Sequence, residues 1–354
     1  MSSPPPRKSK QQRIAAVVTR AGVLGALRGL HDRGRTPVLI LAYHRIAAVE
    51  PPHNYPLDLG LISATAEEFD AQMRALRECA NPVSLDGIAD AITQGRTLPE
   101  RAVAVTFDDG FSDTFEVAFP LLRQHDIPAT VFVSTEHLED DEPFWFELSA
   151  HLVLRVPPRA LACEECPEGL PAADDLDTRR AAIVDIHKLL KRCSIPRRRA
   201  LLADWRRRLA SFIDERACEQ SRPLSRQRLL QMSAAGIEFG SHTVTHPNLA
   251  LATDDVIDRE LRESKHCLTQ LLGRPVRSLA YPFGTPDSYD ARVMSTARAC
   301  GYELAVSYRQ GVNWCGALAA MELRRIGISR GITPEQFRVM LALPGWLHPR
   351  LREH

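Results

Sequence analysis

The sequence has almost no net charge, no long uninterrupted apolar run and no complete set of metal-binding thiols. Its 45 Lys and Arg residues nearly balance 44 Asp and Glu residues, so the formal net charge of +1 gives no general signal for nucleic-acid binding. The apolar stretch 14–30 is broken by Arg20 and Arg28, and it therefore matches neither a signal-peptide core nor a membrane span. Among eight cysteines, Cys163 and Cys166 form a Cys-x-x-Cys pair, but no second pair completes a four-thiolate zinc site. These absences predict a cytoplasmic protein without a signal peptide, with reduced thiols and with no nucleic-acid partner.

Two adjacent carboxylates stand at the end of a short apolar run. Residues 102–107 lead directly into Asp108, Asp109 and Gly110. An Asp-Asp step is costly to bury unless a cation or hydrogen-bond donors compensate it, and a bound metal ion would do so. The alternative is that these residues form an ordinary turn, because Asp and Gly are common in loops.

Two imidazoles follow another apolar segment far downstream. The segment 240–246 reads Gly-Ser-His-Thr-Val-Thr-His and supplies His242 and His246. Two histidines and one carboxylate form a three-ligand set for zinc or a similar divalent ion, with a coordination position left open. The other carboxylate of the Asp pair is then free to act as a base. Pro247 follows His246 directly, which favours a strand-to-loop turn over a helix for this pair.

A third short apolar run, 278–281, ends in a Pro-Phe-Gly turn. The ordered set TFDDG, SHTVTH and YPFG resembles the polysaccharide deacetylases of carbohydrate esterase family 4, over about 39–328 with one large interruption. The resemblance implies that Asp108 is the general base and that a divalent metal, with zinc as the expected ion, is bound by Asp109, His242 and His246. It also implies that the backbone amide of Phe283 serves the oxyanion site. Tyr281, in the same motif, is a further candidate for substrate contact.

Two departures from the family pattern concern the acid and the base. The family's third motif begins with an Arg that steers the base, whereas this chain has Ala280 there. The family's Leu-x-x-His motif, which supplies the general acid, matches 322–328, which contains no histidine. His44, at the end of another apolar segment, is a candidate acid; the alternative is that it only hydrogen-bonds neighbouring loops. Arg325 either positions Asp108 or is an ordinary surface charge.

Short apolar segments alternate with helical stretches along the chain, which predicts an α/β fold with a parallel sheet. The predicted strands are 38–43, 102–107, 129–134, 237–241, 278–281, 303–307 and 323–328. Clear helical patterns cover 66–79 and 254–272. Seven strands suit the irregular (β/α)7-type barrel of the family, here with a helical insertion. The motif residues then lie at the carboxyl ends of strands, where barrel folds place catalysis.

The chain divides into a barrel and several additional segments. We expect a disordered tail at 1–12, an amphipathic helix at 13–34, the deacetylase barrel at 35–138 and 229–340, a helical basic insertion at 139–228 and a C-terminal tail at 341–354. The helix 13–34 either packs on the barrel or rests peripherally on anionic lipid, which would associate the protein with a membrane.

The insertion carries both aromatic and basic side chains. Trp145 either stacks on a sugar ring or anchors a core. The basic residues are Lys188, Lys191, Arg192, Arg197, Arg198, Arg199, Arg206, Arg207 and Arg208. They form either the solvated faces of an accessory helical pair or a lid that handles an anionic glycan or a glycan on a phosphate-bearing lipid.

Together these patterns predict a metal-dependent hydrolase that removes acetyl groups from N-acetylated, or less favourably O-acetylated, sugars. The substrate would be an acetylated glycan or glycolipid: a polysaccharide, an oligosaccharide or a lipid-linked sugar. Two alternatives stay open: an amidase or deformylase that acts on a non-sugar C–N bond, and a glycan-binding pseudoenzyme that has lost its acid.

Overall fold

The computed structural model describes residues 36–49, 55–138, 142–170 and 175–344. The predicted tail 1–12 and helix 13–34 lie outside the described residues, as does most of the predicted tail 341–354. None of the helices in the described part combines the length and the apolar character that crossing a bilayer requires.

Seven parallel strands close into a barrel. They are β1 (Pro37–Tyr43), β5 (Ala102–Phe107), β6 (Ala129–Val133), β7 (Glu238–Ser241), β8 (Ser278–Ala280), β9 (Leu304–Gln310) and β11 (Leu323–Gly327). Each pairs in parallel with the next in this order, and β1 closes the ring by pairing with both β5 and β11. The β1–β5 register runs from Val38 opposite Ala102 to Tyr43 opposite Phe107. The predicted (β/α)7-type barrel is therefore confirmed, and every predicted strand is present.

Four further strands are too short for an apolar period to predict them. They are β2 (Arg45–Ile46), β3 (Ile62–Ala64), β4 (Asn81–Pro82) and β10 (Asn313–Trp314). The β2–β3 pair forms a small separate sheet, whereas β10 extends the start of β1 in the antiparallel direction.

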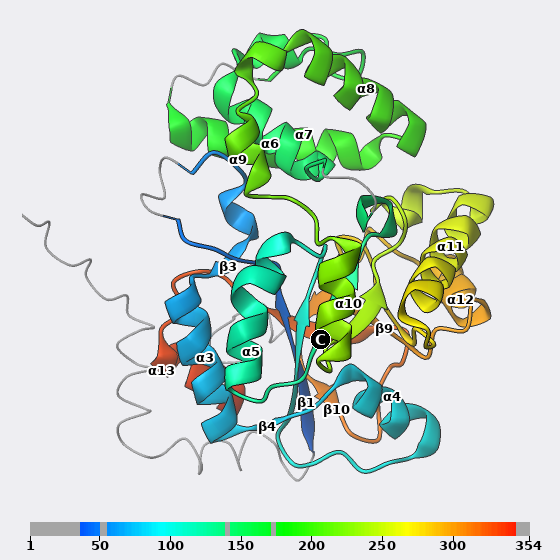
Figure 1. The fold of residues 1–354 in the computed structure, drawn as a ribbon. Helices are drawn as coiled ribbons and strands as arrows, with labels where there is room; N and C mark the ends of the chain where they lie inside the picture. Colours follow the sequence, from blue (N-terminus) through cyan, green and yellow to red (C-terminus); the bar gives the residue numbers. More distant parts are fainter. Residues whose placement is uncertain (1–35, 50–54, 139–141, 171–174, 345–354) are drawn as a thin grey trace, which may run out of the picture.

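Helices cover the outside of the barrel (Figure 1). They are α3 (Ala66–Cys79), α5 (Phe119–Gln124), α10 (Arg226–Ala234), α11 (Asp254–Leu272), α12 (Ala291–Ala299) and α13 (Pro334–Ala342), whereas α4 (Leu85–Gln94) packs against side chains of the barrel interior. The helix α3 begins with a capping box, in which Thr65 and Glu68 satisfy each other's backbone N–H groups. The helix α11 ends at Gly273, whose φ of 64° suits a glycine C-cap. The predicted helices at 66–79 and 254–272 have these same bounds.

Short one-turn elements connect the longer ones: η2 (Leu59–Leu61), η3 (Thr114–Ala118, a π-helical turn), η4 (Thr135–Leu138), η5 (Pro158–Leu161), η6 (Ala210–Phe212) and η7 (Leu249–Leu251).

Strand residues alternate between two apolar layers. Side chains such as Ile40, Ala104 and Val306 fill the barrel interior, where Leu85 and Ile88 of α4 join them. The alternate side chains, such as Leu41 and Val105, pack outward against the surrounding helices. Because both faces are covered, the strands are almost wholly buried, as is usual for parallel sheets.

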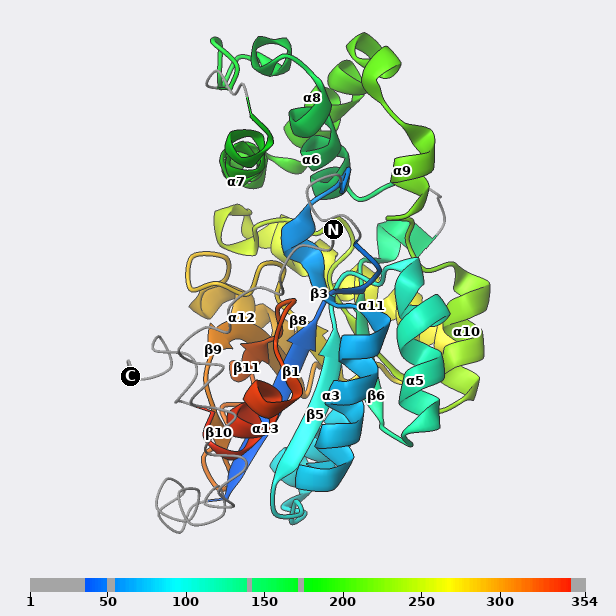
Figure 2. The ribbon, with the colours of Figure 1, turned by 90° about the vertical axis from the view of Figure 1, so that its left-hand side faces the viewer.

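The insertion forms its own helical layer with a separate apolar core. Its helices are α6 (Trp145–Arg155), α7 (Leu176–Arg192), α8 (Ile195–Arg208) and α9 (Glu215–Glu219). Side chains such as Leu152, Ile186 and Trp205 make up this core. Figures 1 and 2 show the layer at the end of the barrel toward which the parallel strands point.

A buried arginine ties the insertion to the barrel. Arg45 of β2 donates from Nε to Asp113 at 2.8 Å and from Nη1 to Glu147 of α6 at 2.8 Å, and it also bonds the main-chain carbonyl of Gln220. The second carboxylate oxygen of Glu147 accepts the Asp58 N–H at 2.9 Å. Removing Arg45 would leave two buried carboxylates without their cation, which is strongly destabilising.

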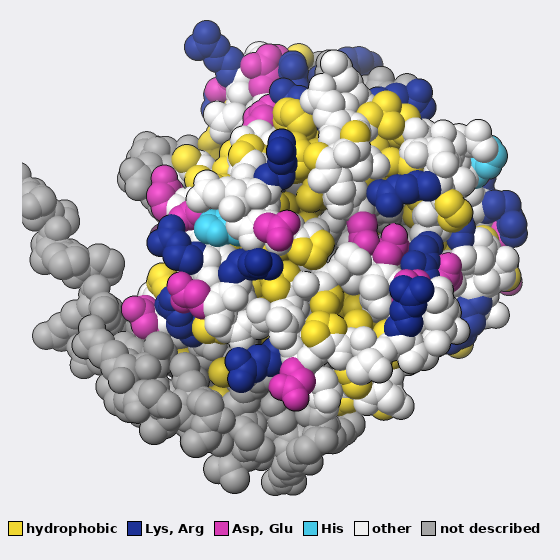
Figure 3. Space-filling model, turned by 60° about the horizontal axis from the view of Figure 1, so that its bottom comes forward, with side chains coloured by type: hydrophobic (Ala, Val, Ile, Leu, Met, Phe, Trp, Pro, Cys, Tyr) yellow, Lys and Arg dark blue, Asp and Glu magenta, His cyan; other side chains and the backbone are white. Residues whose placement is uncertain are grey.

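The surface away from the insertion carries no large region of one charge in the view of Figure 3. Basic and acidic side chains are interspersed there among apolar and uncharged groups.

Candidate active site

Asp108 and Asp109 form a tight turn at the carboxyl end of β5. Asp109 has a φ of 71° and Gly110 a φ of 80°, so two successive residues adopt the left-handed conformation. A Cβ on Gly110 would lie 2.5 Å from Cγ1 of Val133, which makes glycine necessary there. Both carboxylates are buried, so the pair is not an ordinary solvated turn.

Arg325 of β11 holds Asp108 in a bidentate ion pair. Its Nη1 lies 2.7 Å from Oδ1 and its Nη2 lies 2.7 Å from Oδ2, and its Nε donates to the Ser307 carbonyl at 2.8 Å. Burial raises the pKa of Asp108, but the Arg325 guanidinium and then His242 outweigh that effect and lower the pKa to about 2. Arg325 is thus no surface charge: from β11 it supplies the guanidinium that the chain lacks at Ala280.

His242 and His246 converge on Asp109. The Nε2 atoms of the two histidines lie 3.5 Å and 3.4 Å from Asp109 Oδ1 and 3.2 Å from each other. His242 Nδ1 donates to the Ala280 carbonyl at 2.7 Å, which fixes the tautomer and leaves a lone pair on Nε2. Burial lowers the pKa of His246 well below its ordinary value, which favours the neutral imidazole that metals bind.

This arrangement fits a divalent metal ion. One ligand atom from each of Asp109, His242 and His246 lies within 4.8 Å of the others, and all three residues are buried. Two lone-pair nitrogens and a carboxylate oxygen that face one another repel unless a cation lies between them. The prediction of a divalent metal site therefore agrees with the structure.

The loop that carries the histidines is strained and held from two sides. Thr243 and His246 have φ values of 69° and 53°, which side chains rarely adopt. From α11, Glu260 accepts the N–H groups of Val244 and Thr245, each at 2.9 Å. From α8, the buried Arg198 donates to the Thr245 carbonyl at 2.7 Å and to the His246 carbonyl at 3.4 Å. The insertion thus supplies part of the support for the histidine loop, through Arg198.

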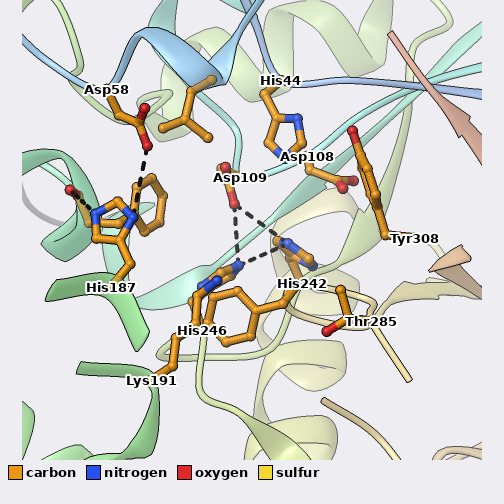
Figure 4. Close-up of a pocket in the computed structure, with 13 residues that line it drawn as sticks. His44, Asp58, Asp108, Asp109, His187, Lys191, His242, His246, Thr285 and Tyr308 are labelled. Carbon is orange, nitrogen blue, oxygen red and sulfur yellow. Dashed lines mark hydrogen bonds and ion pairs between the residues drawn. The ribbon is translucent and has the colours of Figure 1, made fainter. Parts of the chain in front are cut away.

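A pocket of about 250 Å³ opens above the carboxylates (Figure 4). Its lining residues are His44, Asp58, Leu61, Asp108, Asp109, Phe146, His187, Lys191, His242, His246, Phe283, Thr285 and Tyr308. Figure 4 shows His44 and His246 on opposite sides of the pocket, with Asp109 between them. The His44 main-chain N–H donates to Ser63 Oγ at 2.9 Å, and its ring lies 5.7 Å from that of Tyr308.

Phe283 lies at the pocket in an unusual backbone conformation. Its φ is 62°, and its ring centroid is 4.7 Å from that of His246. Lys191 of α7 places Nζ 4.1 Å from the Phe283 ring centroid. Burial lowers the pKa of Lys191, and the charges of Asp287 and Asp58 oppose this only in part.

Two residues predicted to contact substrate do not line the pocket. Tyr281 is fully buried, donates its hydroxyl to the Met321 carbonyl at 3.0 Å and stacks on Tyr289. Since Ala280 faces the barrel interior, Tyr281 faces the outer helical layer. Trp145 is 6% exposed and belongs to the core of the insertion, with Arg198 Cζ 4.7 Å from its ring centroid. Of the two interpretations of Trp145, the structure agrees with the core anchor.

Several pocket residues were not predicted as site residues, although Lys191 was named among the basic residues of the insertion. Tyr308 directly follows the predicted strand 303–307, so its place at a strand end was a usable signal. Asp58 precedes a one-turn helix, and His187 and Lys191 lie within a long helix of the insertion. No motif or apolar period marks these three residues.

The arginine clusters of the insertion are mostly paired with carboxylates. Arg197 pairs with Glu165, and Arg207 and Arg208 both pair with Asp204. Arg199 pairs with Glu136, and Arg206 pairs with Glu142. Arg198 is buried, as described above. These six residues therefore do not form one continuous cationic surface, and most are solvated faces of helices.

Comparison with known proteins gives the family. A family model described as Polysaccharide deacetylase matches residues 95–161 and 183–305, more than half of the chain. The chain belongs to the polysaccharide deacetylase family. The predicted family is thus confirmed.

Relatives within the polysaccharide deacetylase family support this assignment. The chain is 29% identical over 111 residues to the poly-beta-1,6-N-acetyl-D-glucosamine N-deacetylase of Staphylococcus epidermidis, covering 29% of this chain and 38% of that protein. Thus the match spans well under half of that relative. A Streptococcus pyogenes deacetylase, PplD, solved with acetate, superposes with a TM-score of 0.57 at 21% identity, covering 85% of this chain and 96% of that one. IcaB from Ammonifex degensii gives 0.56 at 18% identity, covering 87% and 97%. These two structures share the fold.

Proposed function

We propose that this protein is a metal-dependent deacetylase that hydrolyses the acetamide of N-acetylated sugars in a glycan. One observation carries the proposal: a buried Asp109, His242 and His246 set adjoins Asp108, which Arg325 holds in a bidentate pair, at the floor of one pocket. The name of the staphylococcal relative supports acetylated glucosamine as the sugar.

The donor set supports zinc as the metal. Two histidines and one carboxylate, with room left for a further ligand, are typical of catalytic zinc sites. When bound, such an ion supplies Lewis-acid activation of the acetyl carbonyl and of a water molecule. The protein's part is to fix the ligands, and the Ala280 carbonyl, Glu260 and Arg198 hold the two histidines and their loop from three sides.

Asp108 serves as the base. Its low pKa keeps it ionised at neutral pH, so that a carboxylate oxygen can accept the proton of the attacking water. Arg325 fixes the orientation of that carboxylate through two hydrogen bonds. The Phe283 backbone N–H, held in the turn after Pro282, donates to the oxyanion that develops on the acetyl group.

His44 serves as the acid. The leaving amine must gain a proton as the C–N bond breaks, and His44 lies across the pocket from His246. Its backbone is held by Ser63, and its ring packs beside Tyr308. This position makes up for the histidine that is missing from 322–328. An ester substrate leaves as an alcohol, which needs less help from an acid, so this arrangement favours N-acetyl over O-acetyl groups.

Release of acetate tests the proposal. The zinc-loaded protein is incubated with N-acetylglucosamine oligomers, an O-acetylated xylan and an N-formyl peptide, and free acetate and formate are measured. Acetate from the N-acetylated oligomers, absent with Asp108→Asn, is the expected result. Formate alone would favour the deformylase. Binding of the oligomers without any release would make the protein a glycan-binding pseudoenzyme.

A further inference from the structure

A second and larger hollow adjoins the catalytic pocket. It measures about 740 Å³ and lies between the α7–α8 turn of the insertion and the segment 244–263 of the barrel. Lys191 lines both this groove and the catalytic pocket. The groove and the catalytic pocket therefore meet at Lys191.

The charged side chains that line the groove include more basic than acidic groups. The walls hold four basic side chains, Lys191, Arg192, Arg199 and Arg259, and two carboxylates, Glu260 and Glu263. Glu260 already accepts two backbone N–H groups and the Thr245 hydroxyl, so it is committed to the histidine loop. Arg199 is paired with Glu136. Arg192 of α7 and Arg259 of α11 are both exposed, and Arg259 lies near Asp255.

Apolar side chains lie between these charges. Ile195 and Pro196 contribute from the insertion, and Val244, Pro247 and Leu251 from the barrel. Leu251 is 61% exposed, so its side chain offers apolar surface to a ligand in the groove. Sugar rings have apolar faces edged with polar groups, and a surface of this mixed character suits them.

We propose that this groove binds the sugars that flank the cleaved acetamide, and that it selects glycan chains that carry anionic groups. The inference rests on the proposed deacetylase function and adds the class of substrate. Of the basic residues that the sequence analysis named in the insertion, Arg192 keeps this role, and Arg259 of the barrel joins it.

A charge-reversal experiment tests the selection. The double variant Arg192→Glu/Arg259→Glu is compared with wild type on a heparosan oligosaccharide, which carries carboxylates between N-acetylglucosamine units, and on neutral N-acetylchitopentaose. Arg207→Glu is the matched control, because Arg207 is 78% exposed on α8, pairs with Asp204 and does not line the groove.

The double variant should lower kcat/KM for the heparosan oligosaccharide by on the order of tenfold, the scale of two exposed ion pairs. The decrease for chitopentaose should be several times smaller, and the difference should fade in high salt because the charges are exposed. Arg207→Glu should change neither substrate. Equal decreases on both substrates, or no decrease on heparosan, would overturn the selection of anionic chains.

A steric variant tests occupancy independently of charge. Ala252 lines the groove, so Ala252→Trp should obstruct it and lower the rate on chitopentaose much more than on the short dimer N,N′-diacetylchitobiose. A ratio of the two rates that is unchanged from wild type would show that no sugars enter the groove. If the wild-type protein releases no acetate from any substrate, the proposed deacetylase function itself fails. That result differs from a failure of the charge-reversal test or of the steric test, because in those two cases wild type still releases acetate.

Discussion

The ion pair between Arg325 and Asp108 allows a prediction whose size follows from the structure. The two side chains are 1% and 3% exposed, and two N–O distances of 2.7 Å join them. Replacing Arg325 by Met removes the cation and leaves a buried carboxylate unpaired. Breaking a buried pair from one side costs about 3–5 kcal/mol. We expect Arg325→Met to lower the free energy of unfolding of the metal-free protein by that amount.

The double variant separates the charge effect from lost packing. In Arg325→Met/Asp108→Asn the buried group is neutral, so the protein should recover a large part of the loss. Urea unfolding gives the interaction free energy between the two residues when it is measured on wild type, both single variants and the double variant. The reasoning from a buried ion pair is wrong if the unfolding free energy of Arg325→Met lies within about 1 kcal/mol of that of wild type. It is also wrong if adding Asp108→Asn to Arg325→Met recovers none of the lost stability.

The same pair predicts a pH dependence. The pKa of Asp108 is lowered in the folded protein to about 2, below its unfolded value of about 3.9. Its contribution to stability is therefore fully present above about pH 4 and is lost as the pH falls toward 2. In Arg325→Met, burial raises the pKa of Asp108 without the guanidinium to oppose it, so the difference in unfolding free energy between wild type and variant should already shrink above pH 4 and should be small near pH 2. A difference that stays the same down to pH 2 would contradict the assignment.

Three other predictions address the acid, the ligand loop and the insertion. His44→Ala should lower kcat by on the order of a hundredfold with unchanged metal content, and a substrate with an activated leaving group should recover much of the rate; loss without such recovery would make His44 a positioning residue. Arg198→Met should weaken zinc binding by about 10–100-fold, as measured by competition with a chelator, and Arg198→Lys should recover part of the lost affinity. An unchanged zinc affinity in Arg198→Met would mean that Arg198 does not support His246. Arg45→Met should destabilise the protein by about 3–5 kcal/mol in urea, because two buried carboxylates lose their partner; a change below about 1 kcal/mol would exclude this role.

The barrel and the metal ligands were accessible from the sequence for a physical reason. Parallel strands that are buried on both faces read as short apolar runs, and their carboxyl ends meet at one edge of the barrel. The carboxylates after β5 and the histidines after β7 were therefore expected to meet, and Asp109 lies 3.5 Å from His242. The ligand roles themselves came from the family motifs.

The rest of the site depends on tertiary packing that no local pattern reports. Helical periodicity shows which face of α7 is apolar, but not that α7 lies over the strand ends, where Lys191 and His187 reach the pocket. The Arg45 network that holds the insertion there joins residues far apart in the chain. Tyr281 was misplaced because the motif gives its position in the sequence but not the face of β8 from which its side chain projects.

Metal-dependent release of acetate tests the central claim most directly. The protein is stripped with a chelator, titrated with zinc, and assayed for acetate from N-acetylchitopentaose at each step. The account predicts no release without metal, a rate that rises to a plateau at one ion per chain, and no recovery in Asp109→Ala, while Asp108→Asn binds one ion without turnover. Release at the wild-type rate by the stripped protein or by Asp109→Ala would contradict it.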